Sequence, residues 1–128
     1  MTLRTERIIA RKEGAIGWMI FNHPARHNAI TMDMAEAVPE VMQDFADDAG
    51  IRVVVITGTG EKAFAAGSDI TGFEDVRADP AKNRHYNEVN ERSYNAVYGR
   101  LPWQRRVRRV RRLPSQLIRR VKTLAGRP

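Results

Sequence analysis

The sequence of 128 residues contains no cysteine, and it has no Asp or Glu among residues 99–128. Without cysteine, neither a disulfide nor a thiolate metal site can form. Residues 1–7 are too polar for a secretory signal, and no apolar run approaches the roughly 20 residues of a membrane-spanning helix. The length suits one domain with an ordinary core. We therefore expect a single cytoplasmic domain.

Charge is divided unevenly along the chain. Residues 1–98 contain 11 Lys/Arg and all 15 Asp/Glu, a net charge of −4. Residues 99–128 contain 11 Lys/Arg and no acid, a net charge of +11. The net charge therefore changes abruptly near Tyr98 and Gly99. This change indicates two segments of different physical class, a mildly acidic body and an Arg-rich tail.

The first half of the body alternates strand and helix signals. Residues 7–13 and 15–22 are short apolar runs separated by Gly14, which predicts a hairpin of two strands. Pro24 then ends the second strand, and residues 25–29 are expected to form a loop. The run at 53–57 is apolar and β-branched without alternation, as in a strand of a parallel sheet that is covered on both faces.

A helix is predicted between Thr31, a good N-cap, and Gly50. Pro39 lies inside it and should bend it, at a cost of about 3 kcal/mol unless the packing adapts. Apolar residues recur in this segment at helical spacing and are the expected core. They are Met34, Val38, Val41, Met42, Phe45 and Ala49.

Residues 61–70 are the expected ligand-facing segment. The small residues at 65–68 let the backbone approach a ligand, and a helix beginning near Asp69 would leave amide hydrogens pointing outward. Such amides stabilise an oxygen that develops negative charge. A short helix followed by a loop is expected over 71–80. A weaker helical pattern covers 81–98, and its candidate buried residues are Tyr86, Val89, Tyr94 and Val97.

Two motifs carry a family resemblance. Residues 62–70, KAFAAGSDI, resemble the K-x-F-x-A-G-x-D-[IL] segment of the enoyl-CoA hydratase/isomerase (crotonase) family. Residues 24–30, PARHNAI, are similar to the family's P-x-x-x-N-A-[IL] stretch beside the CoA phosphates and adenine. The resemblance implies an α/β fold, a partial crotonase-like fold of strand–strand–helix units. Residues 1–98 would be the N-terminal portion of that domain.

The same resemblance implies the site. The backbone N–H of Ser68 would be one of two oxyanion-hole amides that hold the thioester carbonyl. The substrate would be a coenzyme A thioester, with no permanently bound cofactor, and complete relatives would form trimers or hexamers. Arg26 and Lys62 could attract a CoA phosphate by charge. The expected coenzyme-binding residues are Arg26, Asn28, Ala29, Lys62, Ala66, Gly67, Asp69 and Ile70.

Other polar side chains give weaker signals. His23 and His27 are four residues apart, which on a helix would suit a metal, but Pro24 disfavours that helix and we predict no metal site. An acid such as Asp69 could be a general acid by type, yet the sequence shows no partner to tune it. His85 is expected to be exposed.

The family's second oxyanion segment and its two catalytic glutamates have no counterpart in residues 99–128. Hydration of a 2-enoyl-CoA is therefore expected only of a complete protein, and this truncated chain is expected to be inactive. The Arg-rich tail could be irregular, or form a cationic helix that binds nucleic acid or an anionic membrane. A third interpretation is a frameshift, because a GC-rich gene read out of frame yields many arginines.

Overall fold

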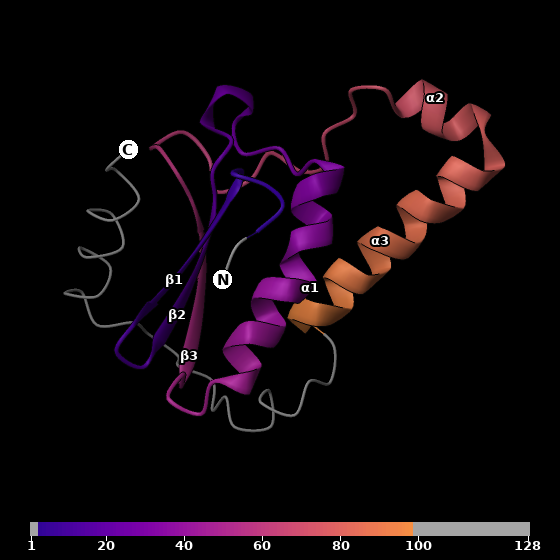
Figure 1. Ribbon diagram of the computed structural model, residues 1–128. Helices are drawn as coiled ribbons and strands as arrows, with labels where there is room; N and C mark the ends of the chain where they lie inside the picture. The colour runs from indigo at the N-terminus through magenta and orange to yellow at the C-terminus, as the bar shows by residue number, and fades with distance from the viewer. Residues whose placement is uncertain (1–2, 99–128) are drawn as a thin grey trace.

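The computed structural model describes residues 3–98, which form a three-stranded sheet with a long helix on one face (Figure 1). The tail of residues 99–128, and every prediction made for it, lies outside the described residues. None of the described helices is both long and apolar enough to span a membrane. The elements in chain order are β1 (Ile8–Glu13), β2 (Ile16–Phe21), the 3-10 turn η1 (Pro24–Arg26), α1 (Met32–Asp47), β3 (Val53–Gly58), α2 (Phe73–Ala78) and α3 (Pro80–Tyr98).

The sheet has the order β1-β2-β3, with β2 in the centre of the described strands. β1 and β2 form the predicted antiparallel hairpin, and Gly14 turns it with a φ of 56°. β3 pairs with β2 in parallel, from Ile16 opposite Val53 to Phe21 opposite Gly58. The α1 helix makes the crossover between these two parallel strands, so the α/β class predicted from the sequence is confirmed.

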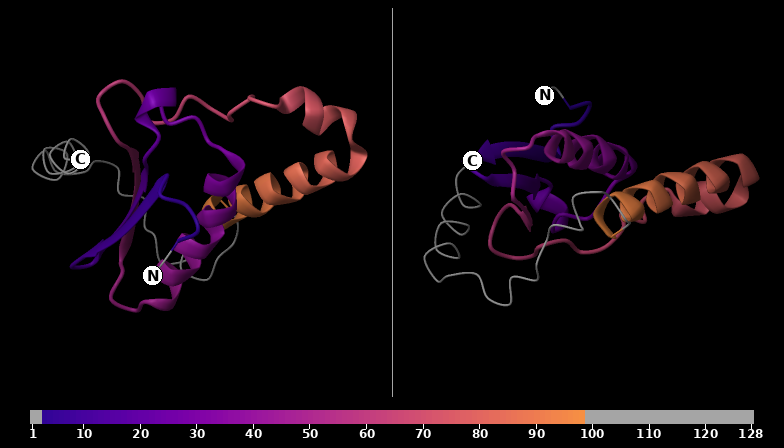
Figure 2. Two further views of the ribbon diagram at one scale, coloured as in Figure 1. Left: turned by 45° about the horizontal axis from the view of Figure 1, so that its top comes forward. Right: turned by 90° about the horizontal axis from the view of Figure 1, so that it is seen from below.

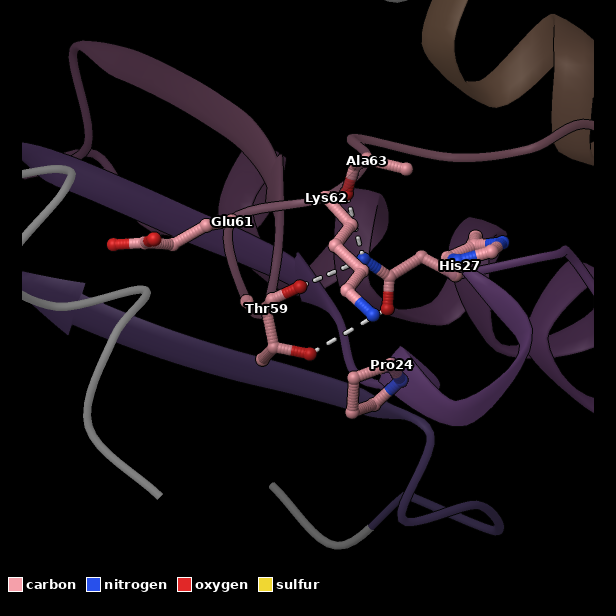
Figure 3. A pocket seen from close by; sticks show the side chains of 8 residues that line it. Pro24, His27, Thr59, Glu61, Lys62 and Ala63 are labelled. Atoms are coloured by element: carbon pink, nitrogen blue, oxygen red, sulfur yellow. Dashed lines mark hydrogen bonds between the residues drawn. The ribbon is translucent and has the colours of Figure 1, made fainter.

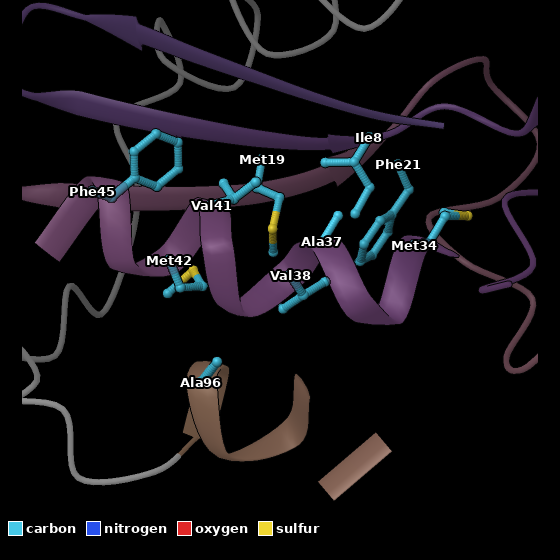
Figure 4. Close-up of a cluster of buried hydrophobic side chains, with 10 residues drawn as sticks. All are labelled: Ile8, Met19, Phe21, Met34, Ala37, Val38, Val41, Met42, Phe45 and Ala96. Atoms are coloured by element: carbon cyan, nitrogen blue, oxygen red, sulfur yellow. The ribbon is translucent and has the colours of Figure 1, made fainter. Parts of the chain in front are cut away.

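The core lies between α1 and the sheet (Figure 4). Met19 and Phe21 alternate along β2 and both face α1, as a strand period of two requires. Gly17 shares this face, where an added Cβ would lie 2.9 Å from the ring of Phe45. The close approach of β2 and α1 at this end therefore depends on a glycine. The buried cluster consists of Ile8, Met19, Phe21, Met34, Ala37, Val38, Val41, Met42, Phe45 and Ala96.

Two expectations for this half need correction. β3 is half-buried along most of its length, whereas the strand that is buried almost throughout is β2. The unalternated apolar run at 53–57 therefore forms an edge strand of the described sheet. Only β2 has a neighbouring strand on both sides. Ala49 is exposed and lies beyond α1, which ends at Asp47. Pro39 is accommodated inside the helix, as expected.

The α2–α3 pair extends away from the sheet, and the buried residues of α3, where it packs against α1, lie in its C-terminal half (Figure 2). Val89 and Ala96 are its buried residues and Val97 is partly buried against the core. Tyr94 was expected to be buried but is 63% exposed, stacked on Tyr98. The predicted loop before α3 is reduced to Asp79, whose carboxylate accepts a hydrogen bond from Ala81 N–H at 2.8 Å and begins the helix.

Candidate functional site

The candidate site is formed where β2 and β3 end at the same edge of the sheet. The segment after β2 contains η1 and continues to α1, and the loop after β3 covers residues 59–72. A parallel bridge joins the two between Ile30 and Ser68. No helix begins near Asp69, because this bridge holds the segment extended and α2 starts only at Phe73. The helix-dipole contribution expected at Ser68 is therefore absent from the described structure.

The bridge fixes the direction of the Ser68 backbone. Ile30 N–H donates to the carbonyl of Gly67 at 2.8 Å, and Asp69 N–H donates to the carbonyl of Ile30 at 2.8 Å. In this parallel bridge, the hydrogen bonds to Ile30 are made by Gly67 and Asp69, the two residues beside Ser68. The N–H of Ser68 itself therefore points away from Ile30. Within residues 3–98, Ser68 N–H has no hydrogen-bond acceptor, and Ser68 is exposed. An oriented, unused amide donor therefore lies at the predicted position.

Gly67 provides the backbone turn before this amide. Its φ is 98°, a conformation that residues with a side chain rarely adopt, and an added Cβ would meet nothing within 4 Å. The glycine is therefore needed here for its backbone freedom and not for space.

Asn28 holds the two loops together. Its side chain is 1% exposed, and its Nδ2 donates to the carbonyls of Thr59 and Ala63, both at 2.9 Å. Its Oδ1 accepts from His23 N–H at 2.9 Å. Asn28 was proposed from sequence as a coenzyme-binding residue, but both hydrogens of its amide are already used within the protein. The sequence did not reveal this clamp, because the acceptors of the Asn28 amide are backbone carbonyls more than 30 residues away.

A second close contact supports the clamp. An added Cβ at Gly58 would lie 2.3 Å from the carbonyl oxygen of Phe64 and 2.5 Å from Nδ2 of Asn28. Gly58 ends β3, so the glycine lets the following loop fold back over the end of the strand. The Phe64 ring then packs on Phe21, with 5.5 Å between centroids.

A pocket of about 250 Å³ lies beside the clamp (Figure 3). In Figure 3, Lys62 extends across it toward Pro24, whereas Glu61 points away. Lys62 is exposed and makes no ion pair with any described residue. The lining residues are Pro24, His27, Asn28, Thr59, Gly60, Glu61, Lys62 and Ala63. A lone cation at the mouth of a partly apolar pocket suits a ligand that carries an anionic group.

Arg26 and Asp69 form a polar contact between η1 and the loop. Arg26 Nη2 donates to Thr71 Oγ1 at 2.8 Å and lies 3.5 Å from Asp69 Oδ1, which also accepts from Thr71 N–H at 2.9 Å. Hydrogen bonds from Thr71, and then the positive charge of Arg26, lower the pKa of Asp69. The sequence showed no partner for Asp69. A carboxylate with a lowered pKa is ionised at neutral pH and is a poor general acid.

The remaining predicted site residues lie around the same loop. Ala29 is buried next to Asn28 in the chain, Ala66 is exposed beside Gly67, and Ile70 is 73% exposed. His23 and His27 flank η1 rather than sharing a helix face, and within the described residues no three His, Asp or Glu gather as for a metal. His85 is exposed as expected and lies 3.4 Å from Glu36 on α1.

Comparisons with known proteins agree with this architecture. The family model for enoyl-CoA hydratase/isomerase matches residues 16–99. A crotonyl-CoA hydratase of Syntrophomonas wolfei is 31% identical over 92 residues, which cover 72% of this chain and 35% of that protein. A mitochondrial 3-hydroxyisobutyryl-CoA hydrolase of Gallus gallus is 30% identical over 91 residues, covering 70% and 24%.

A solved structure shows the same arrangement in three dimensions. The enoyl-CoA hydratase/carnithine racemase from Magnetospirillum magneticum superposes with a TM-score of 0.67 at 33% identity, over 73% of this chain and 35% of that one. The fold and the loop at its sheet edge thus define an α/β domain of the crotonase type over the matched residues. The chain belongs to the enoyl-CoA hydratase/isomerase family, and it spans about a third or less of the length of these relatives.

Proposed function

We propose that this chain binds an acyl-CoA thioester, with Ser68 N–H donating to the thioester carbonyl. The observation that carries the proposal is the bridge to Ile30, which leaves the Ser68 amide pointing away from Ile30 and without an acceptor among the described residues. A donor held in place before the ligand arrives needs no reorganisation when negative charge develops on that oxygen. Lys62, at the mouth of the adjacent pocket, is the proposed partner of a coenzyme phosphate.

The finer activity is a proposal for a complete protein. The matched relatives include a hydratase and a hydrolase by name, so the part of the fold that they share with this chain does not select the reaction. We propose hydration of a 2-enoyl-CoA, a lyase reaction of fatty acid metabolism, when a second amide donor and two acid–base groups are supplied. Removing one oxyanion donor costs about 3–4 kcal/mol, and general acid–base groups contribute about 10²- to 10⁴-fold in rate. The 128-residue chain by itself is therefore expected to show no useful turnover.

Binding is the direct test. Titration of the purified chain with crotonyl-CoA and with free CoA, followed by isothermal calorimetry, is expected to show tighter binding of the thioester by about 2- to 10-fold, the range of one neutral hydrogen bond. No saturable binding of either compound would overturn the proposal. Turnover of crotonyl-CoA at the rate of an ordinary enzyme would overturn the expected inactivity.

A matched pair of glycine variants locates the donor. Gly67→Ala introduces a Cβ into open space at a φ of 98°, so it should reorient the Ser68 amide and abolish the preference for thioester over CoA. Gly14→Ala makes the same kind of change, at a φ of 56° and in open space, in the hairpin turn. The preference should survive in this control. Loss in both variants would indicate a global effect.

The alternative function, binding of nucleic acid or anionic membrane by the tail, concerns residues outside the described structure. Cytoplasmic location and homo-oligomers of complete proteins likewise remain predictions from the sequence and the resemblance.

A further inference from the structure

We propose that Arg26 is a positioning residue for the Ser68 amide and not the ligand of a coenzyme phosphate. This inference rests on the proposed function, because the amide matters through the thioester it would bind. It reassigns the role that charge alone suggested for Arg26, and it leaves Lys62 as the phosphate-binding cation. Three features of the described residues support it.

The first feature is the place of the Arg26 contacts. Its guanidinium extends from η1 to Thr71 Oγ1 at 2.8 Å and to Asp69 Oδ1 at 3.5 Å. Both partners lie within three residues of Ser68, on its C-terminal side. The Ile30 bridge already holds the peptides on either side of Ser68. Arg26 therefore adds a second anchor just beyond the bridge, in a loop that contains no other regular structure before α2.

The second feature is the state of Asp69. Its side chain is 12% exposed although its neighbours Ser68 and Ile70 are exposed, and its carboxylate also accepts from Thr71 N–H at 2.9 Å. A largely covered carboxylate is favourable only when charged or polar groups compensate it. Arg26 supplies that charge. Without it, Asp69 would tend to turn toward water, which would strain the bond from Asp69 N–H to the Ile30 carbonyl and so loosen the bridge that orients Ser68.

The third feature is the contrast between the two cations. The charge of Arg26 is compensated by Asp69 beside it, which weakens its attraction for a phosphate. Lys62 makes no ion pair within residues 3–98 and lines the pocket. A dianionic group entering the site would thus be drawn more strongly to Lys62 than to Arg26.

The test uses three variants and a control. Arg26→Gln removes the charge and the long donor. Thr71→Val removes the acceptor of Arg26 and the side-chain hydrogen bond of Thr71 to Asp69, but it retains the Arg26 charge and the backbone N–H at position 71. Lys62→Gln removes the proposed phosphate contact. Arg52→Gln is the matched control, because Arg52 is exposed at the opposite end of β3 and its side chain has no partner among the described residues.

Two readouts separate positioning from phosphate binding. The ratio of the dissociation constants for CoA and crotonyl-CoA reports the contacts of the acyl group and excludes those of the phosphates, since both compounds carry the same phosphates. Arg26→Gln and Thr71→Val should each lower this ratio toward 1, the value without the thioester contact, with the affinity for CoA unchanged. Lys62→Gln should weaken CoA and crotonyl-CoA equally, and Arg52→Gln should change neither.

The second readout needs no ligand. In ¹H–¹⁵N spectra of the free chain, Arg26→Gln and Thr71→Val should shift or broaden the Ser68 amide signal, while Arg52→Gln leaves it in place. An unmoved Ser68 signal in Arg26→Gln overturns the inference, as does equal weakening of CoA and crotonyl-CoA by that variant. If the unmodified chain binds neither compound, the proposed function fails, and the Ser68 signal alone then decides whether Arg26 positions the amide.

Discussion

α1 and α3 are the two long helices of the described chain, and they are stabilised in different ways. α1 has 16 residues, seven of them buried against the sheet and α3, whereas α3 has 19 residues with only Val89 and Ala96 buried. Burial of apolar area stabilises by about 25 cal/mol per Å². The helix under the sheet thus carries most of the apolar stabilisation, and α3 depends on its C-terminal contact with α1.

The candidate site is formed by the segment before α1 and by the loop between β3 and α2, and it belongs to neither helix. Its loop covers residues 59–72 and is held by polar contacts, the Asn28 clamp at one end and the Arg26–Thr71 contact at the other. Exposed ligand-binding loops elsewhere are commonly positioned by a rigid scaffold in this manner. Apolar packing stabilises α1, whereas polar contacts hold the 59–72 loop. Mutations can therefore change the stability of the core and the geometry of the site separately.

The largest expected effect comes from the core. Phe45→Ala should lower the free energy of unfolding by about 3–5 kcal/mol, because it leaves a cavity between α1 and the β2 strand at Gly17. Val89→Ala on α3 removes two methyl groups and should cost about 1–2 kcal/mol. Urea unfolding followed by circular dichroism measures both. Equal losses of unfolding free energy in the two variants would show that α3 belongs to the core as fully as α1, and would contradict the difference between the two helices.

A smaller loss is expected at the clamp. Asn28→Ala should cost about 2–4 kcal/mol, because it removes the hydrogen bonds to Thr59 and Ala63 and places alanine at a φ of 57°. Asn28→Gly keeps the backbone conformation accessible and should cost about 1 kcal/mol less. Amide hydrogen exchange should accelerate over residues 59–64 in both variants, while α1 remains protected. A fully stable Asn28→Gly chain would show that the side-chain amide contributes nothing.

The smallest effect concerns a polar contact at the start of α1. Asp33 accepts hydrogen bonds from Thr31 and Thr5 and lies 3.1 Å from Arg7. Burial raises the pKa of Asp33, but these hydrogen bonds and then the Arg7 charge outweigh it, so the pKa is lowered. Its ionised form therefore stabilises the fold above about pH 4, and this contribution is lost as the pH falls through the lowered pKa.

The variant Asp33→Asn tests whether the ionised form of Asp33 stabilises the fold. The variant should be less stable than the unmodified chain at pH 7 by under about 1 kcal/mol, because solvent screens a partly exposed pair. The difference should shrink below pH 4 and vanish once Asp33 is protonated. Urea unfolding at pH 7, 4 and 2.5 gives the three values. A difference that grows in acid would contradict the assignment.

Much of the fold follows from local signals in the sequence. The hairpin was predicted from two apolar runs around Gly14, and the α1 helix from the spacing of Met34, Val38 and Phe45. Both signals are local, since a turn and a helix period are set by neighbouring residues. Two motifs in order also indicated the family, because each keeps small residues where the backbone turns or approaches a ligand.

Burial on α3 and β3 could not be predicted in this way. Tyr94 fits the helical stripe but faces solvent, and β3 has the composition of an inner strand but lies at an edge of the described sheet. Which face is covered depends on what lies opposite it, and periodicity contains no information about the partner. The same reason explains the helix expected near Asp69, where pairing with Ile30 keeps the backbone extended.

The sequence by itself determined the element types, the family and the position of the candidate amide at Ser68. Tertiary structure alone decided what orients that amide. The contacts of Ser68's neighbours with Ile30, of the Asn28 amide with Thr59 and Ala63, and of Asp69 with Arg26 each join residues more than 30 positions apart along the chain. Hydrogen bonds between such distant groups form only after the crossover through α1 has brought β2 and β3 side by side, so no local pattern in the sequence could contain them.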